Sequence, residues 1–254
     1  MRNSEDTDGK VGAAPAGTHA VPAAQIAARE ELAHRLNDVT QVTLRPVAPA
    51  TPTGFLGLAA ATVVLAAMNL GWIPSSEAHT VALVMIAFVF PLQGTASVFG
   101  FLSRDGVVAT AMAVLAGTWL TVGLAMLTSP PGSTSDALGV LLLVSAVAML
   151  LPAVGASFSK LVPALVFFTA ALRLATGGIY QLTSSTTWER ITGWIGIVLG
   201  VLAVYAAMAA LLESVMGRTV LPMGRRSKGR LAMEGGLTEQ LVDLTHEPGV
   251  REQL

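Results

Sequence analysis

The chain has 254 residues, of which 53% are hydrophobic and only 12% are charged, and its mean hydropathy is +0.65. Soluble globular domains carry about 25% charged residues, so the composition excludes an ordinary soluble domain and points to a lipid bilayer. Cysteine is absent, which excludes a disulfide framework, a thiolate nucleophile and a cysteine-based metal site. The formal net charge of −1 is uninformative, because the distribution of charge along the chain matters more than its sum.

Long apolar stretches alternate with short polar breaks along most of the chain. A helix that spans a bilayer needs about 20 mostly apolar residues, and six stretches meet this length. The alternation predicts an all-α, polytopic membrane protein with six transmembrane helices. The expected spans are 54–73, 79–101, 106–127, 137–156, 161–182 and 191–215.

The segments outside the spans divide the chain into three parts. Residues 1–50 form an N-terminal segment whose composition favours disorder at first and then an amphipathic helix at about 23–42. Residues 51–222 form the six-helix domain, and residues 223–254 form a basic and then mixed tail. The amphipathic helix suits a position on the membrane surface, and binding of a partner protein stays an alternative.

Basic residues near the ends of the spans predict the orientation of the protein. With six crossings, the positive charges fall almost entirely on one side, and Arg190 alone lies on the other. Cytoplasmic loops carry the excess of Lys and Arg, so we expect both termini in the cytoplasm and the chain in the plasma (inner) membrane. The residues on the basic side are Arg45, Arg104, Lys160, Arg218, Arg225, Arg226, Lys228 and Arg230.

Residues for chemistry inside the membrane are missing from the pattern. The chain has no paired histidines, no metal-ligand cluster and no Gly-rich phosphate loop, and Glu213 is the only acid that falls within an expected span. A proton pump would be expected to carry a relay of buried acids. We therefore expect no enzyme activity, cofactor, bound metal or nucleic-acid partner, and favour a conduit for small solutes.

The stretch "GWIGIVLGVLAVYAAMAALLESVMGRTVLPMG" (193–224) resembles the last helix and exit of the acetate/succinate uptake transporter family. Shorter matches in the first, third and fifth spans, such as "GTWLT" (117–121), extend the resemblance over about 55–224. The motif residues are Leu56, Gly57, Leu58, Trp119, Gly193, Trp194, Gly217, Arg218 and Pro222.

The resemblance implies a six-helix bundle with a central pore in each protomer, assembled as a homo-hexamer in the lipid bilayer. It implies transport of a small organic anion, acetate or a related short monocarboxylate and sometimes succinate. Proton-coupled uptake and channel-like conduction are both open, and no cofactor is implied. The family has a Tyr at a narrow point of its third helix, where this chain has Leu115, so the preferred carboxylate does not transfer.

Several residues within the expected spans are candidates for the substrate pathway. Asn69, Gln93 and Thr118 are polar, and hydrogen bonding between helices is the alternative interpretation for each. Leu115 is expected in an apolar constriction with polar groups on either side. A small-residue face that includes Gly196 favours close helix packing over contact with solute.

Arg173 stands in the middle of the fifth apolar span, where a cation is expensive. At its depth the sixth span is expected to offer Ala203 and Tyr205, and no carboxylate. We count Arg173 and Tyr205 among the candidates for the substrate pathway. Three interpretations stay open. Arg173 extends toward the membrane surface, is held by backbone carbonyls and Tyr205, or faces the pore and attracts an anion.

Two other functions compete with carboxylate transport. A six-helix channel for a neutral solute such as urea or ammonia would fit the same helices. A membrane protein that transports nothing, and binds partners through its terminal segments, would fit the amphipathic helix and the basic tail.

Overall fold

The computed structural model describes residues 48–226 of the chain. The expected amphipathic helix at 23–42, the rest of the N-terminal segment before residue 48 and the tail beyond residue 226 lie outside the described residues.

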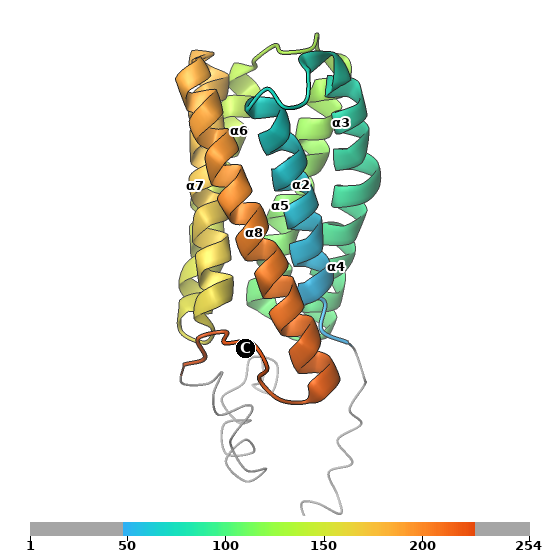
Figure 1. Cartoon of the computed structure of the whole chain (residues 1–254), viewed down its shortest axis with the longest axis vertical. Helices are drawn as coiled ribbons and strands as arrows, with labels where there is room; N and C mark the ends of the chain where they lie inside the picture. Colours follow the sequence, from blue (N-terminus) through green and yellow to red (C-terminus); the bar gives the residue numbers. More distant parts are fainter. Residues whose placement is uncertain (1–47, 227–254) are drawn as a thin grey trace, which may run out of the picture. The chain divides into compact units, whose positions relative to one another are not determined.

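The described part of the chain is a helical bundle (Figure 1). Within residues 48–226 it holds six segments long and apolar enough to cross a membrane, which confirms the all-α, multi-pass prediction. The elements in chain order are α2 (Thr51–Asn69), η1 (Ser75–Glu77), α3 (Ala78–Val84), η2 (Met85–Val89), α4 (Phe90–Leu102), α5 (Gly106–Thr128), α6 (Asp136–Ser157), α7 (Leu161–Thr183) and α8 (Thr186–Met216).

The second span is broken in its middle. The π-helix η2, Met85–Val89, separates α3 from α4, and Pro91 lies in the first turn of α4. Proline has no N–H to donate to the preceding turn, and single π turns of this kind accommodate such gaps within helices. One widened turn therefore accommodates Pro91 within the second span.

The turn between α7 and α8 is shorter than the sequence suggested. α8 begins at Thr186 rather than at residue 191, and only Ser184 and Ser185 separate it from α7. Ser184 has a left-handed backbone with φ of 51°, which reverses the chain at once. In an antiparallel pair, residue 173 lies 183 − 173 = 10 residues before the turn and so faces residue 186 + 10 = 196.

Glycines on α8 let α2 approach it closely. A Cβ at Gly196 would lie 3.0 Å from Ala66 Cβ and 3.1 Å from Thr62 O, and one at Gly200 would lie 2.4 Å from Val63 Cγ2. These positions leave no room for a side chain, which confirms the packing interpretation of this face, and the contact lies within one protomer.

A second close contact joins α6 and α7. A Cβ at Gly178 would lie 2.9 Å from the backbone oxygen of Gly139 and 2.8 Å from Leu143 Cγ. The two backbones therefore meet through a pair of facing glycines, and the backbone oxygen cannot move aside as a side chain can.

A segment that we call the terminal strap, residues 217–226, folds back against the start of α7 (Figure 1). Gly217 ends α8 with a left-handed φ of 62°. The first free N–H groups of α7, on Leu161 and Val162, donate to Gly224 O and Met223 O at 3.1 and 3.2 Å. The strap thus caps a helix N-terminus, whose N–H groups have no partner within the helix.

Gly178→Ala should destabilise the bundle, because its Cβ would meet a backbone oxygen at 2.9 Å. Overpacking of this kind costs about 1–3 kcal/mol, so the unfolding temperature in detergent should fall. Gly117→Ala is the control, because Gly117 also lies within a helix and a Cβ there meets nothing within 4 Å. Equal unfolding temperatures for the two variants would contradict the packing account.

Candidate functional site

Two cavities lie at opposite ends of the bundle. The loop-end cavity has a volume of about 360 Å³ and is lined in part by the connections after α2 and α5. The terminal-end cavity has a volume of about 230 Å³ and is lined in part by residues beside the start of α5, the start of α7 and the end of α8. Each helical hairpin turns at one of these ends, so the cavities approach each other from the two sides of the bundle.

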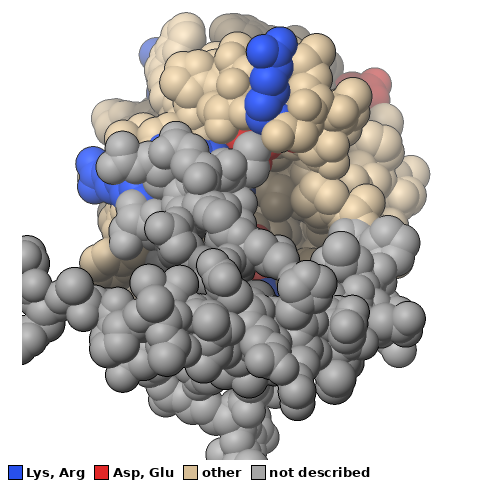
Figure 2. Space-filling model, turned by 90° about the horizontal axis from the view of Figure 1, so that it is seen from below, with Lys and Arg blue, Asp and Glu red and all other residues tan. Residues whose placement is uncertain are grey.

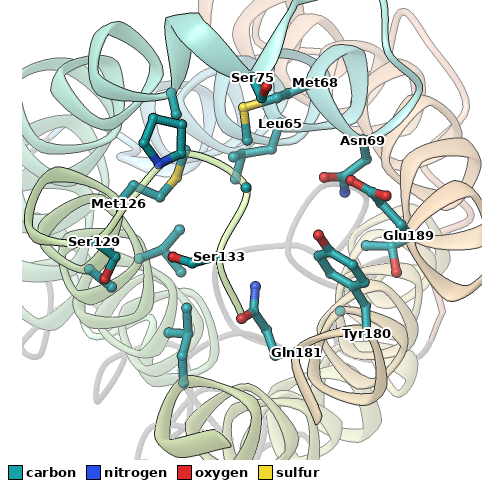
Figure 3. A pocket seen from close by; sticks show the side chains of 18 of the residues that line it. Leu65, Met68, Asn69, Ser75, Met126, Ser129, Ser133, Tyr180, Gln181 and Glu189 are labelled. Carbon is teal, nitrogen blue, oxygen red and sulfur yellow. The ribbon is translucent and has the colours of Figure 1, made fainter. Parts of the chain in front are cut away.

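Polar side chains surround the opening of the loop-end cavity. Figure 3 shows Asn69, Tyr180 and Glu189 gathered on one side of the opening, with Gln181 next to them. Gln181 Oε1 accepts a hydrogen bond of 2.9 Å from the backbone N–H of Ser135, which ties α7 to the connection before α6. The opening is therefore polar and carries one acid, Glu189.

Deeper in the same cavity the lining includes a cation. Arg173 and Trp119 both line the loop-end cavity, although their exposed fractions are only 5% and 1%. The guanidinium carbon of Arg173 lies 5.3 Å from the centre of the Trp119 ring, within the range of a cation–π interaction. On the other side, a Cβ at Gly196 would come within 3.0 Å of Arg173 Nε, so the missing side chain makes the room that Arg173 occupies.

Arg173 has no acidic partner within residues 48–226. Its side chain makes no salt bridge or hydrogen bond there, and its Nε is buried without an acceptor. Trp119 Nε1 is likewise buried without an acceptor among the described residues. Buried donors normally find a partner, so two unsatisfied donors at one place mark this part of the cavity.

An apolar layer separates the two cavities. On α5, Met112 and Leu115 come after Val108, which lines the terminal-end cavity, and before Trp119, which lines the loop-end cavity. The same order along α2, α6 and α7 brings further buried side chains to this level. We define the apolar layer as Phe55, Leu58, Met112, Leu115, Met149 and Phe167, which are each 0% exposed and belong to one buried cluster. Phe167 also lines the terminal-end cavity, so it forms the face of the layer on that side.

The terminal-end cavity carries charges of both signs. Asp105, Lys160 and Glu213 line it, and Glu213 also forms a salt bridge with Arg225 of the terminal strap. Burial first, and then the charge of Arg225, lower the pKa of Lys160, whereas Glu213 and Asp105 act in the opposite direction. Figure 2 shows Lys and Arg side chains standing out from the described part of this end.

The structure places the predicted pathway residues at three different positions. Asn69 and Arg173 line the loop-end cavity, and Leu115 lies in the apolar layer. Gln93 and Thr118 line neither cavity.

Both of these polar side chains contact a neighbouring helix. Gln93 is fully buried, and its Nε2 donates to Gly54 O over 3.4 Å, while its Oε1 has no partner within residues 48–226. The Thr118 hydroxyl lies 2.7 Å from Val114 O and 3.1 Å from Ser145 Oγ on α6. The alternative of bonding between helices therefore describes Thr118 well.

The expected position of Tyr205 was wrong. Its hydroxyl donates to Pro222 O at 3.0 Å, toward the terminal strap, and Tyr205 lines neither cavity. The late start assumed for α8 accounts for part of the error, because the short turn at Ser184 and Ser185 brings Gly196, rather than Ala203, beside Arg173. Extension of Arg173 toward the membrane surface is also excluded, since its side chain is buried within the protomer.

Sequence reasoning missed the acid at the loop end. The expected sixth span starts at residue 191 and leaves Glu189 outside it, whereas Glu189 belongs to the first turn of α8 and lines the loop-end cavity. A signal was present: "Thr186-Thr187-Trp188-Glu189" before an apolar run has the form of a helix start. Tyr180, Asp105 and Lys160 were missed because only the folding of the helices brings them to the cavities.

Most of the motif residues take part in helix packing or helix ends rather than in lining a cavity. Leu58 and Trp119 are buried in the core, Gly193 packs against Leu70, and Gly217 ends α8. Trp194 is exposed and makes an edge contact with the Trp72 ring at 6.1 Å. Leu56 and Arg218 are also exposed, Gly57 packs against Gln93, and Pro222 accepts the hydrogen bond from Tyr205.

No family model matches the chain. Comparison with known proteins gives relatives by sequence and a solved structure with a similar fold. The chain is 29% identical over 182 residues to the succinate-acetate/proton symporter SatP of Escherichia coli K12, which covers 68% of this chain and 93% of the relative. The same protein of Shigella flexneri matches equally well. By name these relatives are transporters and not enzymes.

A solved structure agrees with the sequence relatives. The bacterial acetate channel SatP matches with a TM-score of 0.62 and 28% identity, over 70% of this chain and 99% of that one. The match covers almost the whole of the solved chain, in agreement with the resemblance of 193–224 and the shorter motifs. Both comparisons therefore support the resemblance of the chain to the acetate/succinate uptake transporter family.

Proposed function

We propose that the protein moves acetate and related short carboxylates across a membrane, along a path from the loop-end cavity, through the apolar layer, to the terminal-end cavity. The observation that carries the proposal is the pair of cavities that approach each other from opposite ends of one bundle, with a single apolar layer between them. Such an arrangement has two entrances and one barrier. The names of the relatives, a succinate-acetate/proton symporter and an acetate channel, supply the solute.

The charges of the path favour an anion. The buried cation Arg173 lines the loop-end cavity just before the apolar layer. The acids within the described spans, Glu77, Asp136, Glu189 and Glu213, all lie in the first or last turn of a span. The path therefore has a positive charge at depth and no fixed negative charge at the same depth to repel an anion.

The substrate itself offers a way across the apolar layer. Carboxyl groups have an ordinary pKa of about 4, and an apolar environment favours their neutral form. A carboxylate that takes up a proton from water in the cavity becomes a neutral carboxylic acid and crosses in that form, and no chain of protein acids is required. Protonation of the substrate is then compatible with both proton-linked uptake and channel-like conduction. Succinate would have to take up two protons to become neutral.

The proposed assembly is a homo-hexamer with its terminal end in the cytoplasm. Basic residues at the terminal end, including Arg104 and Lys160, support this orientation, since positive loops stay in the cytoplasm. Outward-facing side chains of α6 such as Val144, Val147 and Leu151 suit contact with lipid or with another copy.

The orientation and the assembly can be tested because the chain has no cysteine. A single Ser133→Cys in the loop-end connection should react with a membrane-impermeant maleimide added to whole cells. Reaction only after the cells are opened would reverse the proposed orientation. Native mass spectrometry should show six copies, and a monomer alone would contradict the hexamer.

Purified protein in liposomes should take up labelled acetate and propionate when the outside is more acidic than the inside. The gradient supplies the proton that neutralises the carboxylate. Uptake should be faster than in protein-free liposomes, which control for diffusion of the free acid, and unlabelled acetate should compete. Uptake equal to that of empty liposomes would contradict the proposal.

A neutral-solute channel is the second candidate, and the apolar layer favours it because a neutral solute crosses such a layer without a proton. Labelled urea and methylamine, which in its neutral form stands in for ammonia, belong in the same assay. Uptake of either one that acetate does not inhibit, with no uptake of acetate, would replace the first proposal by the second. A protein that transports none of these solutes would support the non-transporting alternative.

Leu115→Ala should speed acetate uptake several-fold and admit larger acids, because it opens the apolar layer, whereas Leu115→Trp should slow it. Leu124→Ala is the matched control, since Leu124 lies on the same helix and is 48% exposed, against 0% for Leu115. Initial uptake rates per folded protein give the comparison. Equal rates for all three variants would remove Leu115 from the path.

A further inference from the structure

We propose that Arg173 and Trp119 form a carboxylate-binding site in the loop-end cavity, which holds a monocarboxylate anion before it crosses the apolar layer. The proposal rests on the proposed function, and it assigns the site of recognition to residues of this chain. Arg173 is the residue least expected in an apolar span, and the contacts around it carry the three arguments below.

The first argument is the missing counter-charge. Arg173 is 5% exposed, and within residues 48–226 its side chain makes no salt bridge or hydrogen bond. A buried cation without an acid keeps its full desolvation penalty, and an Arg at the centre of a spanning helix is costly. Because Arg173 lines the cavity, a carboxylate that enters the cavity can supply the missing charge.

The second argument is that the guanidinium is already positioned. The Trp119 ring lies 5.3 Å from its central carbon, and Gly196 leaves the room that Nε occupies, so a Cβ there would lie only 3.0 Å away. Thr62 O and Ala66 Cβ crowd the same point of α8. A side chain held between a ring and a close helix contact loses little freedom when it binds a ligand, and such preorganisation favours affinity.

The third argument concerns the donors. A guanidinium has five N–H groups in a planar fork that fits the two oxygens of a carboxylate. Trp119 lines the same cavity and has one further N–H, on Nε1, which has no acceptor within residues 48–226. A spherical anion such as chloride cannot use the fork in this way, so the site should prefer a carboxylate.

The walls define the rest of the ligand. Leu65, Val122, Leu138 and Leu142 line the same cavity and suit a short alkyl chain. The charged and titratable groups in the lining are Arg173, Tyr180 and Glu189. Glu189 precedes Gly196 by 196 − 189 = 7 residues on α8, which is about 10 Å along a helix. A second carboxylate that reaches toward the opening would meet this acid, so propionate should bind better than succinate.

The binding test uses Trp119 as a local probe. The chain has four Trp residues, and replacing Trp72, Trp188 and Trp194 by Phe leaves Trp119 as the single fluorophore. Sodium propionate, titrated at constant ionic strength into this purified protein, should change the fluorescence to saturation, and sodium chloride should not. In the same background Arg173→Gln should weaken propionate binding at least tenfold, and Arg173→Lys should weaken it less.

Arg190→Gln is the matched control, because Arg190 lies at the same end, is exposed and does not line the cavity. It loses the same charge and should bind propionate as well as the parent protein does. Trp119→Phe in the otherwise unchanged chain keeps a ring beneath the cation and removes the N–H, so the stabilisation of the protein by propionate against heat should fall.

The outcomes separate the site from the transport function. Equal propionate binding by the Arg173→Gln variant and the Arg190→Gln variant would overturn the site, even if the parent protein transports acetate. Binding that depends on Arg173 in a protein that transports nothing would uphold the site and overturn the proposed function. If Arg173→Gln fails to fold, judged by its elution as a single species and its unfolding temperature, Arg173→Lys and Trp119→Phe decide. Unchanged binding by both would count against the site.

Discussion

The enclosure of Arg173 is the constraint on which the structure of the path depends. A cation in the middle of an apolar helix has to leave the lipid, and here it does so because α8 has no side chain at Gly196. The same glycine lets Thr62 O of α2 come within 3.1 Å of the position where a Cβ would stand. Three helices, α2, α7 and α8, thus meet around one guanidinium. Loss of the glycine would separate them and displace the charge at the same time.

The position of the charge gives the two cavities different roles. On the loop-end side an anion meets a polar opening first, a buried cation next, and then the apolar layer. On the terminal-end side the charges are mixed, and the salt bridge between Glu213 and Arg225 fastens the terminal strap beside the cavity. A weak acid can use such a path because it changes between anion and neutral molecule. Recognition requires the anion, and passage through the apolar layer requires the neutral form.

The sequence predicts the helices well, because run length and polar breaks are properties of each segment alone. It also predicts the tight packing around Gly196 and Gly200, because a glycine has no side chain to keep a neighbouring helix away. It fails at positions that depend on register between helices. The predicted start of α8 is five residues too late, at 191 instead of 186, which leaves Glu189 outside the helix. Gly196, rather than the expected Ala203, lies beside Arg173, and Tyr205 lies farther along α8. The contact between Arg173 and Trp119 joins α7 to α5, and no sequence pattern in either helix predicts this contact.

The most direct measurement is the position of a heavy-atom carboxylate in crystals of the protein. Soaking with 3-bromopropionate and collecting anomalous data locates the bromine without reference to transport. The account predicts a bromine peak in the loop-end cavity against the wall of Leu65 and Leu142, with the carboxylate at Arg173. It predicts that the peak disappears in the Arg173→Gln variant and stays in the Arg190→Gln variant. A peak that persists in Arg173→Gln, or one found only outside the loop-end cavity, would contradict the account.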